Sequence, residues 1–189
     1  MHRYLNKGII LGTHPVFGPG AKSLANQNFV LTPTNKEEEI LAGKTRLYLE
    51  ERGANVAIMT PQEHDRMMTV VLGLGHFIAI VSADTLLGFE NFQEMKKIGG
   101  TTFKLLYTLI ASVIAEDPEL YASLQMSFPN IKEVESLFQS QAKIWADMVN
   151  NDDKQGFARK MNTLREKLEK TDPFFRHAYE NMNRIAEKL

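Results

Sequence analysis

Three histidines and one lysine are the residues of this 189-residue sequence best placed to do chemistry. His14 follows the apolar run Ile9–Leu11. We predict a strand over Gly8–Gly12 that presents His14 at its carboxyl end, where α/β sheets bind ligands. A neutral imidazole there can act as a general base near neutral pH. A histidine held by backbone hydrogen bonds before Pro15 is an equally good interpretation, and the spacing leaves both open.

His76 lies in the most apolar stretch of the sequence, Val70–Ala83, where an ionisable group is costly to bury without a partner. It is either a hydrogen-bonded core histidine or a residue facing a cleft. His64 precedes it by twelve residues, which on an ideal α-helix separates the two by about 18 Å along the axis and about 120° around it. The two therefore do not bind one metal ion together. With Glu63 and Asp65 beside it, His64 has the surroundings of an interacting first-turn residue.

Lys104 is a candidate cation because it lies among apolar residues in the segment T-T-F-K-L-L-Y. The alternative is a surface lysine whose stem lies along apolar neighbours while its ammonium remains in water. The sequence holds no H-E-x-x-H, EF-hand or nucleophile motif, which disfavours metal and acyl-transfer chemistry. It also lacks both glycine-rich phosphate motifs. Gly18–Gly20 is a poor substitute because its central proline has no backbone donor.

The elements that must position these residues change in kind near residue 60. Before it, strand-length apolar runs at Phe29–Leu31 and Val56–Met59 flank one helix. Thr34 with Glu37 predicts a capping box at the start of that helix, and Gly53 predicts its end. These first 60 residues therefore have an α/β pattern.

From residue 60 onward the pattern is helical. Thr60, Pro61 and Glu63 form a second capping signal. Val70–Ala83 is shorter than the roughly 20 residues of a membrane span, so we expect a buried core helix there. Further helix starts are predicted at Asp117–Pro118, at Asn130 with Glu133, at Asp152–Asp153 and at Asp172–Pro173.

Composition narrows the possible partners and location. The chain carries 22 Lys and Arg against 23 Asp and Glu, a net charge of −1, and so has no global basic field for nucleic acid or an anionic membrane. The 43% of hydrophobic residues is typical of a soluble, globular chain. The absence of cysteine fits a reducing cytoplasm. We therefore expect a cytoplasmic protein without nucleic-acid or membrane partners.

Six segments share their order and spacing with one known group of enzymes. They are Gly12–Pro19 (G-T-H-P-V-F-G-P), Leu31–Pro33, Glu63–Met68 (E-H-D-R-M-M), His76–Phe77, Asp117–Ala122 and Asn151–Phe157. Together they resemble the prephenate dehydrogenase family over nearly the whole chain. The H-P-x-F-G element followed by E-H-D-R-x-M makes the resemblance specific.

The resemblance implies a two-domain enzyme of tyrosine biosynthesis, with an N-terminal dinucleotide domain and a helical C-terminal domain that forms a homodimer. By it, residues 1–60 are the C-terminal remnant of the dinucleotide-binding domain, and residues 61–189 are the helical substrate-binding and dimerisation domain. The expected fold class is mainly α: an all-helical dimerisation domain preceded by the last α/β elements of a truncated Rossmann-like domain.

The implied reaction is the oxidative decarboxylation of prephenate to 4-hydroxyphenylpyruvate with NAD or NADP. His14 matches the catalytic histidine, which accepts the proton of the substrate's 4-hydroxyl while hydride leaves the same carbon and loss of carbon dioxide aromatises the ring. His76 matches a histidine that lines the substrate pocket and is implicated in sensing tyrosine as an inhibitor. Because the missing N-terminal domain would bind most of the cofactor, we expect little or no turnover from this chain alone.

The same resemblance assigns further contacts. Thr13 and His64 are expected at the substrate, and Pro15 and Gly18 at the cofactor. The family's substrate-binding arginine falls on Lys104, which keeps the charge but loses the bidentate fork for a carboxylate. Substrate affinity or choice is therefore expected to differ.

Three alternatives stay open. Arogenate could replace prephenate as the substrate. The chain could instead be a noncatalytic, dimeric tyrosine-binding regulatory module. Another β-hydroxyacid-type dehydrogenase would share the plan of a nucleotide domain followed by helices, although the motif set argues against it.

Overall fold

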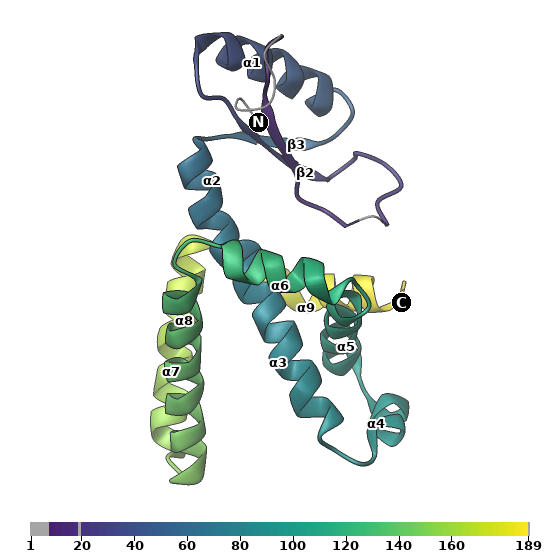
Figure 1. Cartoon of the computed structure of the whole chain (residues 1–189). Coiled ribbons are helices and arrows are strands. Elements are labelled where there is room, and N and C mark those ends of the chain that lie inside the picture. The colour runs from purple at the N-terminus through teal and green to yellow at the C-terminus, as the bar shows by residue number, and fades with distance from the viewer. Residues whose placement is uncertain (1–7, 19, 189) are drawn as a thin grey trace. The chain divides into compact units, whose positions relative to one another are not determined.

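The chain divides into two compact units, Met1–Met68 and Thr69–Leu189 (Figure 1). The computed structural model describes residues 8–18 and 20–188. The division falls after Met68, inside a helical segment, whereas the sequence pattern changes at residue 60. The two positions differ because residue 60 is where the helical pattern begins, whereas the division lies within the helix that runs from Pro61 to Leu87.

The first unit is a small three-stranded sheet with one helix between its last two strands. Its elements are β1 (Gly12–Pro15), β2 (Asn28–Thr32), α1 (Lys36–Glu50), β3 (Asn55–Ile58) and α2 (Pro61–Met68). The strand order is β1-β2-β3, with β2 antiparallel to β1 and parallel to β3. The parallel pair joined by α1 confirms the α/β pattern predicted for this part.

The first strand lies later in the chain than expected. The predicted strand over Gly8–Gly12 is wrong, because β1 begins only at Gly12 and continues through His14, which pairs with Val30. Gly8 adopts φ +87°, a left-handed conformation that does not belong to an extended strand. His14 therefore lies within a strand and not beyond its carboxyl end.

The core of this unit forms around the central strand and the end of α1. Phe29, Leu49 and Ala54 are buried together, with partly buried apolar side chains packed against them. Gly53 ends α1 as predicted, since it takes φ +81° and the Ala54 amide donates to the Leu49 carbonyl, as in a Schellman motif.

The start of α1 is displaced by one residue from the predicted capping box. Asn35 is the N-cap and accepts a hydrogen bond from the Glu38 amide, so Thr34 with Glu37 is not the capping pair. The Glu38 carboxylate instead accepts hydrogen bonds from the amide and hydroxyl of Thr34 and from the side chain of Asn35. Either neighbouring pair satisfies the sequence rule, and the turn geometry selects the second.

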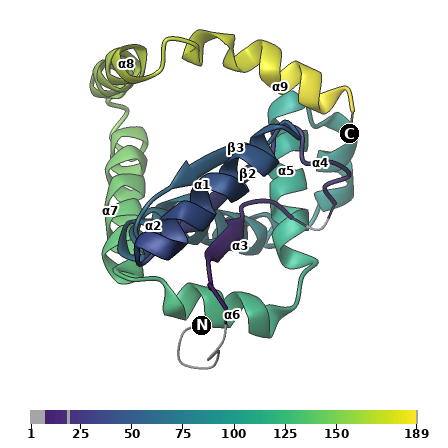
Figure 2. The same cartoon turned by 90° about the horizontal axis from the view of Figure 1, so that it is seen from above.

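The second unit is entirely helical in the residues described (Figures 1 and 2). Its elements are the π-helix η1 (Thr69–Leu74), α3 (Gly75–Leu87), α4 (Phe92–Ile98), α5 (Thr101–Ile114), α6 (Pro118–Ser127), α7 (Ile131–Asn150), α8 (Lys154–Thr171), the 3₁₀ turn η2 (Phe175–His177) and α9 (Ala178–Ala186). Helix α3 packs against α5, α5 against α9, and α7 against both η1 and α8.

Most of the predicted helix starts are confirmed. Asp117 and Asp153 cap α6 and α8 through their side chains, and α7 begins directly after Asn130. The start predicted at Asp172–Pro173 is wrong in detail. The Asp172 carboxylate accepts a hydrogen bond from the Phe174 amide and closes a turn, which delays α9 to Ala178. The fold class, mainly α with a small sheet, is as expected.

The apolar segment Val70–Ala83 is not the buried core helix that its hydropathy predicts. Segments α2, η1 and α3 form one helix, Pro61–Leu87. Its most apolar 18-residue stretch has a mean hydropathy of 1.9, and only 17% of that stretch is buried. By length and composition alone this helix is long enough to cross a membrane. Val70, Val71, Ile80 and Val81 are exposed. Hydropathy identifies the helix but does not determine what covers it.

Candidate functional site

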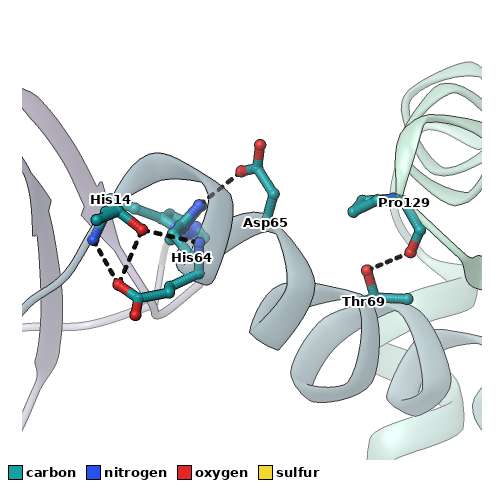
Figure 3. A network of polar contacts seen from close by, with 7 residues as sticks. His14, His64, Asp65, Thr69 and Pro129 are labelled. Carbon is teal, nitrogen blue, oxygen red and sulfur yellow. Dashed lines mark hydrogen bonds and ion pairs between the residues drawn. The ribbon is translucent and has the colours of Figure 1, made fainter. Parts of the chain in front are cut away.

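The first candidate residue, His14, is half-buried on β1 and directly contacts His64. Nδ1 of His14 lies 2.8 Å from Nε2 of His64, and the two rings meet edge to face with centroids 5.0 Å apart. Exposure alternates along β1, so His14 points to the opposite face from Thr13 and Pro15. Figure 3 shows the histidine pair.

His64 is held in place by a locally determined helix start. Thr60 and Glu63 form the predicted capping box, with the Thr60 amide and hydroxyl donating to the Glu63 carboxylate and the Glu63 amide donating to the Thr60 hydroxyl. The same contacts lower the pKa of Glu63. The His64 amide donates to the Thr60 carbonyl in the first turn. A capping box that the sequence predicts therefore orients the residue that contacts His14.

The second ring nitrogen of His64 is also engaged. Nδ1 of His64 lies 2.8 Å from a carboxylate oxygen of Asp65 (Figure 3). Asp65, His64 and His14 thus form a continuous chain of polar contacts. The sequence places His64 and Asp65 together but gives no sign that His14, fifty residues earlier, joins them.

The electrostatics of this site favour a neutral His14. Burial lowers the pKa of His14 below its ordinary value, and the nearby His64 lowers it further. A histidine with a lowered pKa is mostly unprotonated near neutral pH and can accept a proton. The site therefore contains a histidine that can accept a proton, in contact with a second histidine.

The start of α1, the helix between β2 and β3, already holds a carboxylate of the chain itself. The Thr34 amide and hydroxyl and the Asn35 side chain, just before α1, donate to the Glu38 carboxylate. Gly18, predicted at the cofactor, lies exposed in the loop after β1, beside a shallow surface depression lined by Phe17 and Gln27. A phosphate at α1 would have to compete with a carboxylate of the chain itself.

His76 belongs to the helical unit, where its ring lies 4.7 Å from that of Tyr121 on α6. Its Nδ1 is buried and has no hydrogen-bond partner among the described residues. Burial lowers the pKa of His76 and raises that of Tyr121. Tyr121 in turn lines a pocket between α3, α5 and α6, together with Ile80, Val113, Glu116, Gln125 and Met126.

Lys104 is exposed on α5 and is not brought to this pocket. Nine residues separate it from Val113, the nearest pocket residue on the same helix, which corresponds to about 13.5 Å along the axis. The described part of the chain offers its ammonium no ion-pair partner. Within this unit, Lys104 and His76 are therefore not neighbours.

Sequence reasoning missed two residues that contact the candidate histidines. Asp65 was named only as an acidic neighbour of His64, and Tyr121 only as part of the Asp117–Ala122 segment. The adjacency of Asp65 to His64 was a usable signal, whereas the contact of Tyr121 with His76 depends on tertiary packing. Residues 8–18 and 20–188 contain no group of three His, Asp or Glu side chains placed to hold a metal ion.

Comparison with known proteins identifies the family. The family model "Prephenate dehydrogenase, dimerization domain" matches residues 60–163, more than half of the chain. The chain therefore belongs to the prephenate dehydrogenase family and contains its dimerization domain.

Two relatives illustrate the extent of the similarity. A probable arogenate/prephenate dehydrogenase of Methanocaldococcus jannaschii is 35% identical over 164 residues, which cover 85% of this chain and 37% of the relative. The T-protein of Enterobacter agglomerans is 28% identical over 84% of this chain and 42% of its own length. The chain thus spans less than half the length of these relatives.

Solved structures share the fold. Prephenate dehydrogenase from Aquifex aeolicus, in complex with hydroxyphenyl propionate and NAD⁺, aligns with a TM-score of 0.63 and 20% sequence identity. The alignment covers 86% of this chain and 59% of the Aquifex chain. Arogenate dehydrogenase from Synechocystis matches 85% of this chain and 61% of its own with the same TM-score and 16% identity. At this level of identity the likeness establishes the fold alone.

Proposed function

We propose that this chain is the substrate-binding and dimerising part of a cytoplasmic prephenate dehydrogenase of tyrosine biosynthesis. Joined to a dinucleotide-binding domain, it would take part in the NAD(P)-dependent oxidative decarboxylation of prephenate. The observation that carries the proposal is His14, a half-buried histidine with a lowered pKa whose Nδ1 contacts His64. Its position in the G-T-H-P segment is the one that the family resemblance assigns to the base.

The chemistry assigned to this chain is proton removal. His14 accepts the proton of the substrate hydroxyl, and the electron pair of that O–H bond forms the carbonyl as the carbon is oxidised. A nicotinamide dinucleotide held mainly outside this chain would take up the hydride. Because the sequence holds neither glycine-rich phosphate motif, we expect the chain alone to show little or no turnover.

Dimerisation and small-molecule binding are part of the same proposal. The matched domain is described as a dimerization domain, and the Pro61–Leu87 helix exposes apolar side chains that a second copy would cover. His76 and Tyr121 lie beside a pocket of the helical unit, where we place contacts to prephenate or to tyrosine as an inhibitor.

The test is NADH or NADPH formation when this chain is mixed with a separately produced dinucleotide-binding domain of a relative, with prephenate and arogenate compared. We expect turnover that the His14→Asn substitution lowers by about 10²- to 10⁴-fold. The matched control is His177→Asn, which replaces a histidine in η2 of the helical unit and should leave turnover unchanged.

Full activity of His14→Asn would refute the assignment of the base. A mixture that associates, binds tyrosine and shows no turnover would favour the noncatalytic regulatory module instead. Preference for arogenate over prephenate would keep the mechanism and change the substrate.

A further inference from the structure

The chain of contacts from Asp65 through His64 to His14 determines where protons can lie. A carboxylate accepts hydrogen bonds and has none to donate. Nδ1 of His64, 2.8 Å from the Asp65 oxygen, must therefore carry a proton and donate it to this bond. Neutral imidazole has only one N–H, so Nε2 of a neutral His64 is an acceptor.

The same logic then applies to His14. Its Nδ1 lies 2.8 Å from Nε2 of His64, and one proton must lie between these two nitrogens. Because Nε2 of His64 is the acceptor, Nδ1 of His14 is the donor. The single proton of neutral His14 is thus on Nδ1, which leaves the lone pair on Nε2. No hydrogen bond to Nε2 of His14 is present among the described residues.

We propose that His64, oriented by Asp65, is a positioning residue that holds His14 in the Nδ1–H tautomer and so keeps Nε2 of His14 available to accept a proton. This inference rests on the proposed function for the identity of the proton donor. It gives His64 a different role from the substrate contact expected from the sequence, because both of its ring nitrogens are already engaged inside the protein.

The exposure of each side chain shows which residue of the Asp65–His64–His14 chain can be substituted without disturbing the packing. The Asp65 side chain is 62% exposed, whereas that of His64 is 18% exposed. Replacing Asp65 therefore removes the acceptor of the His64 proton without opening a cavity. Asp65→Asn keeps an acceptor oxygen and removes the charge, and Asp65→Ala removes both. Glu37→Ala is the matched control, since it deletes an exposed carboxylate from a different helix, α1, of the same unit.

The direct measurement is nitrogen NMR of this chain labelled with ¹⁵N-histidine, at a pH well above 6.5, the ordinary histidine pKa. Substituting each histidine singly assigns the signals. We expect Nδ1–H tautomers for both His14 and His64 in the wild type and in Asp65→Asn. In Asp65→Ala we expect both to shift toward Nε2–H, and in Glu37→Ala neither should change. Backbone amide spectra report whether each variant is folded.

A wild-type His14 that carries its proton on Nε2 would overturn the inference, as would an unchanged tautomer in Asp65→Ala. The kinetic companion is turnover in the mixture with a dinucleotide-binding domain. There Asp65→Ala should lower kcat by about 10- to 100-fold at constant KM, less than the loss of His14 itself.

The two proposals fail in distinguishable ways. The expected tautomers without any turnover would refute the proposed function and leave the positioning role of His64 intact. Turnover by a chain whose His14 holds the Nε2 proton would refute only the positioning role.

Discussion

The two units of this chain satisfy their side chains to very different degrees. In the α/β unit the central strand residues Phe29–Leu31 are buried, and the polar side chains of the α1 cap bond one another. The helical unit exposes many large apolar side chains, and buries two side-chain atoms that lack partners among the described residues, His76 Nδ1 and Gln125 Oε1. The α/β unit also exposes large apolar side chains, such as Leu47 on α1, so the clearer difference lies in the buried polar atoms.

The two half-buried histidines show the same contrast on a smaller scale. Burial lowers the pKa of both His14 and His76. Among the described residues, Nδ1 of His14 contacts His64, whereas Nδ1 of His76 has no hydrogen-bond partner. Burial favours the neutral form of a histidine, whereas a hydrogen-bond partner determines which ring nitrogen carries the proton.

The largest expected effect concerns the exposed apolar face. Val81 lies on α3 about half a turn from the buried Ala79 and Ala83. If a second copy covers this face, Val81→Lys buries an unpaired charge and should weaken the dimer by more than about 100-fold. Light scattering across a concentration series measures this. Leu47→Lys on α1 of the α/β unit is the control and should not alter the mass. A wild-type monomer at micromolar concentration would contradict the dimer proposal.

A smaller effect is expected within the helical unit itself. A Cβ at Gly73 would lie 2.8 Å from Ile131 Cδ1 and 3.1 Å from the Phe128 ring, whereas a Cβ at Gly75 meets nothing within 4 Å. Gly73→Ala should cost about 1–3 kcal/mol of unfolding free energy through overpacking. Gly75→Ala should raise it by up to about 1 kcal/mol, because alanine favours the helix. Chemical denaturation measures both, and equal effects would contradict the close packing seen at Gly73.

The smallest expected effect is the contribution of His76 to the pH dependence of stability. A lowered folded-state pKa means that the unfolded chain binds more protons just below pH 6.5, so stability falls as pH decreases through that range and levels off below the folded pKa. His76→Phe removes one such group and an unpaired buried nitrogen. It should raise the unfolding free energy by about 1 kcal/mol and flatten its pH dependence. Denaturation at pH 7 and pH 5 tests this, and an unchanged slope would show that His76 is not responsible.

Local rules predicted much of the fold, and tertiary contacts account for what they missed. The Thr60 capping box and the turn at Gly53 depend on residues within one or two turns, so the sequence identified them. The strand carrying His14 was misplaced because its register is determined by pairing with β2. The second unit's apolar helix was expected to be buried because hydropathy describes the side chains and not their surroundings.

The candidate site followed the same division. The family resemblance indicated His14 and His64 separately, and Asp65 was visible beside His64. Their connection into one chain of contacts required two elements fifty residues apart to meet, which no local spacing encodes. Lys104 was predicted at the substrate but is exposed on α5, whereas Tyr121, which was given no role, contacts His76.

The π-helix η1 constrains how this family segment can change in length. Thr69 at its start donates to the Pro129 carbonyl (Figure 3), and the Gly73 carbonyl near its end accepts a hydrogen bond from Gln125. A π turn accommodates one more residue per hydrogen-bonded turn than an α turn. Deleting one residue between Thr69 and Leu74 would let the helix revert to α geometry while the angle between Thr69 and His76 stays nearly the same, because the π turn holds the one residue that is removed. The distance and angle that an ideal α-helix gives between His64 and His76 therefore do not apply, and the loss of a single codon in this segment would keep His76 on the side of the helix that contacts Tyr121.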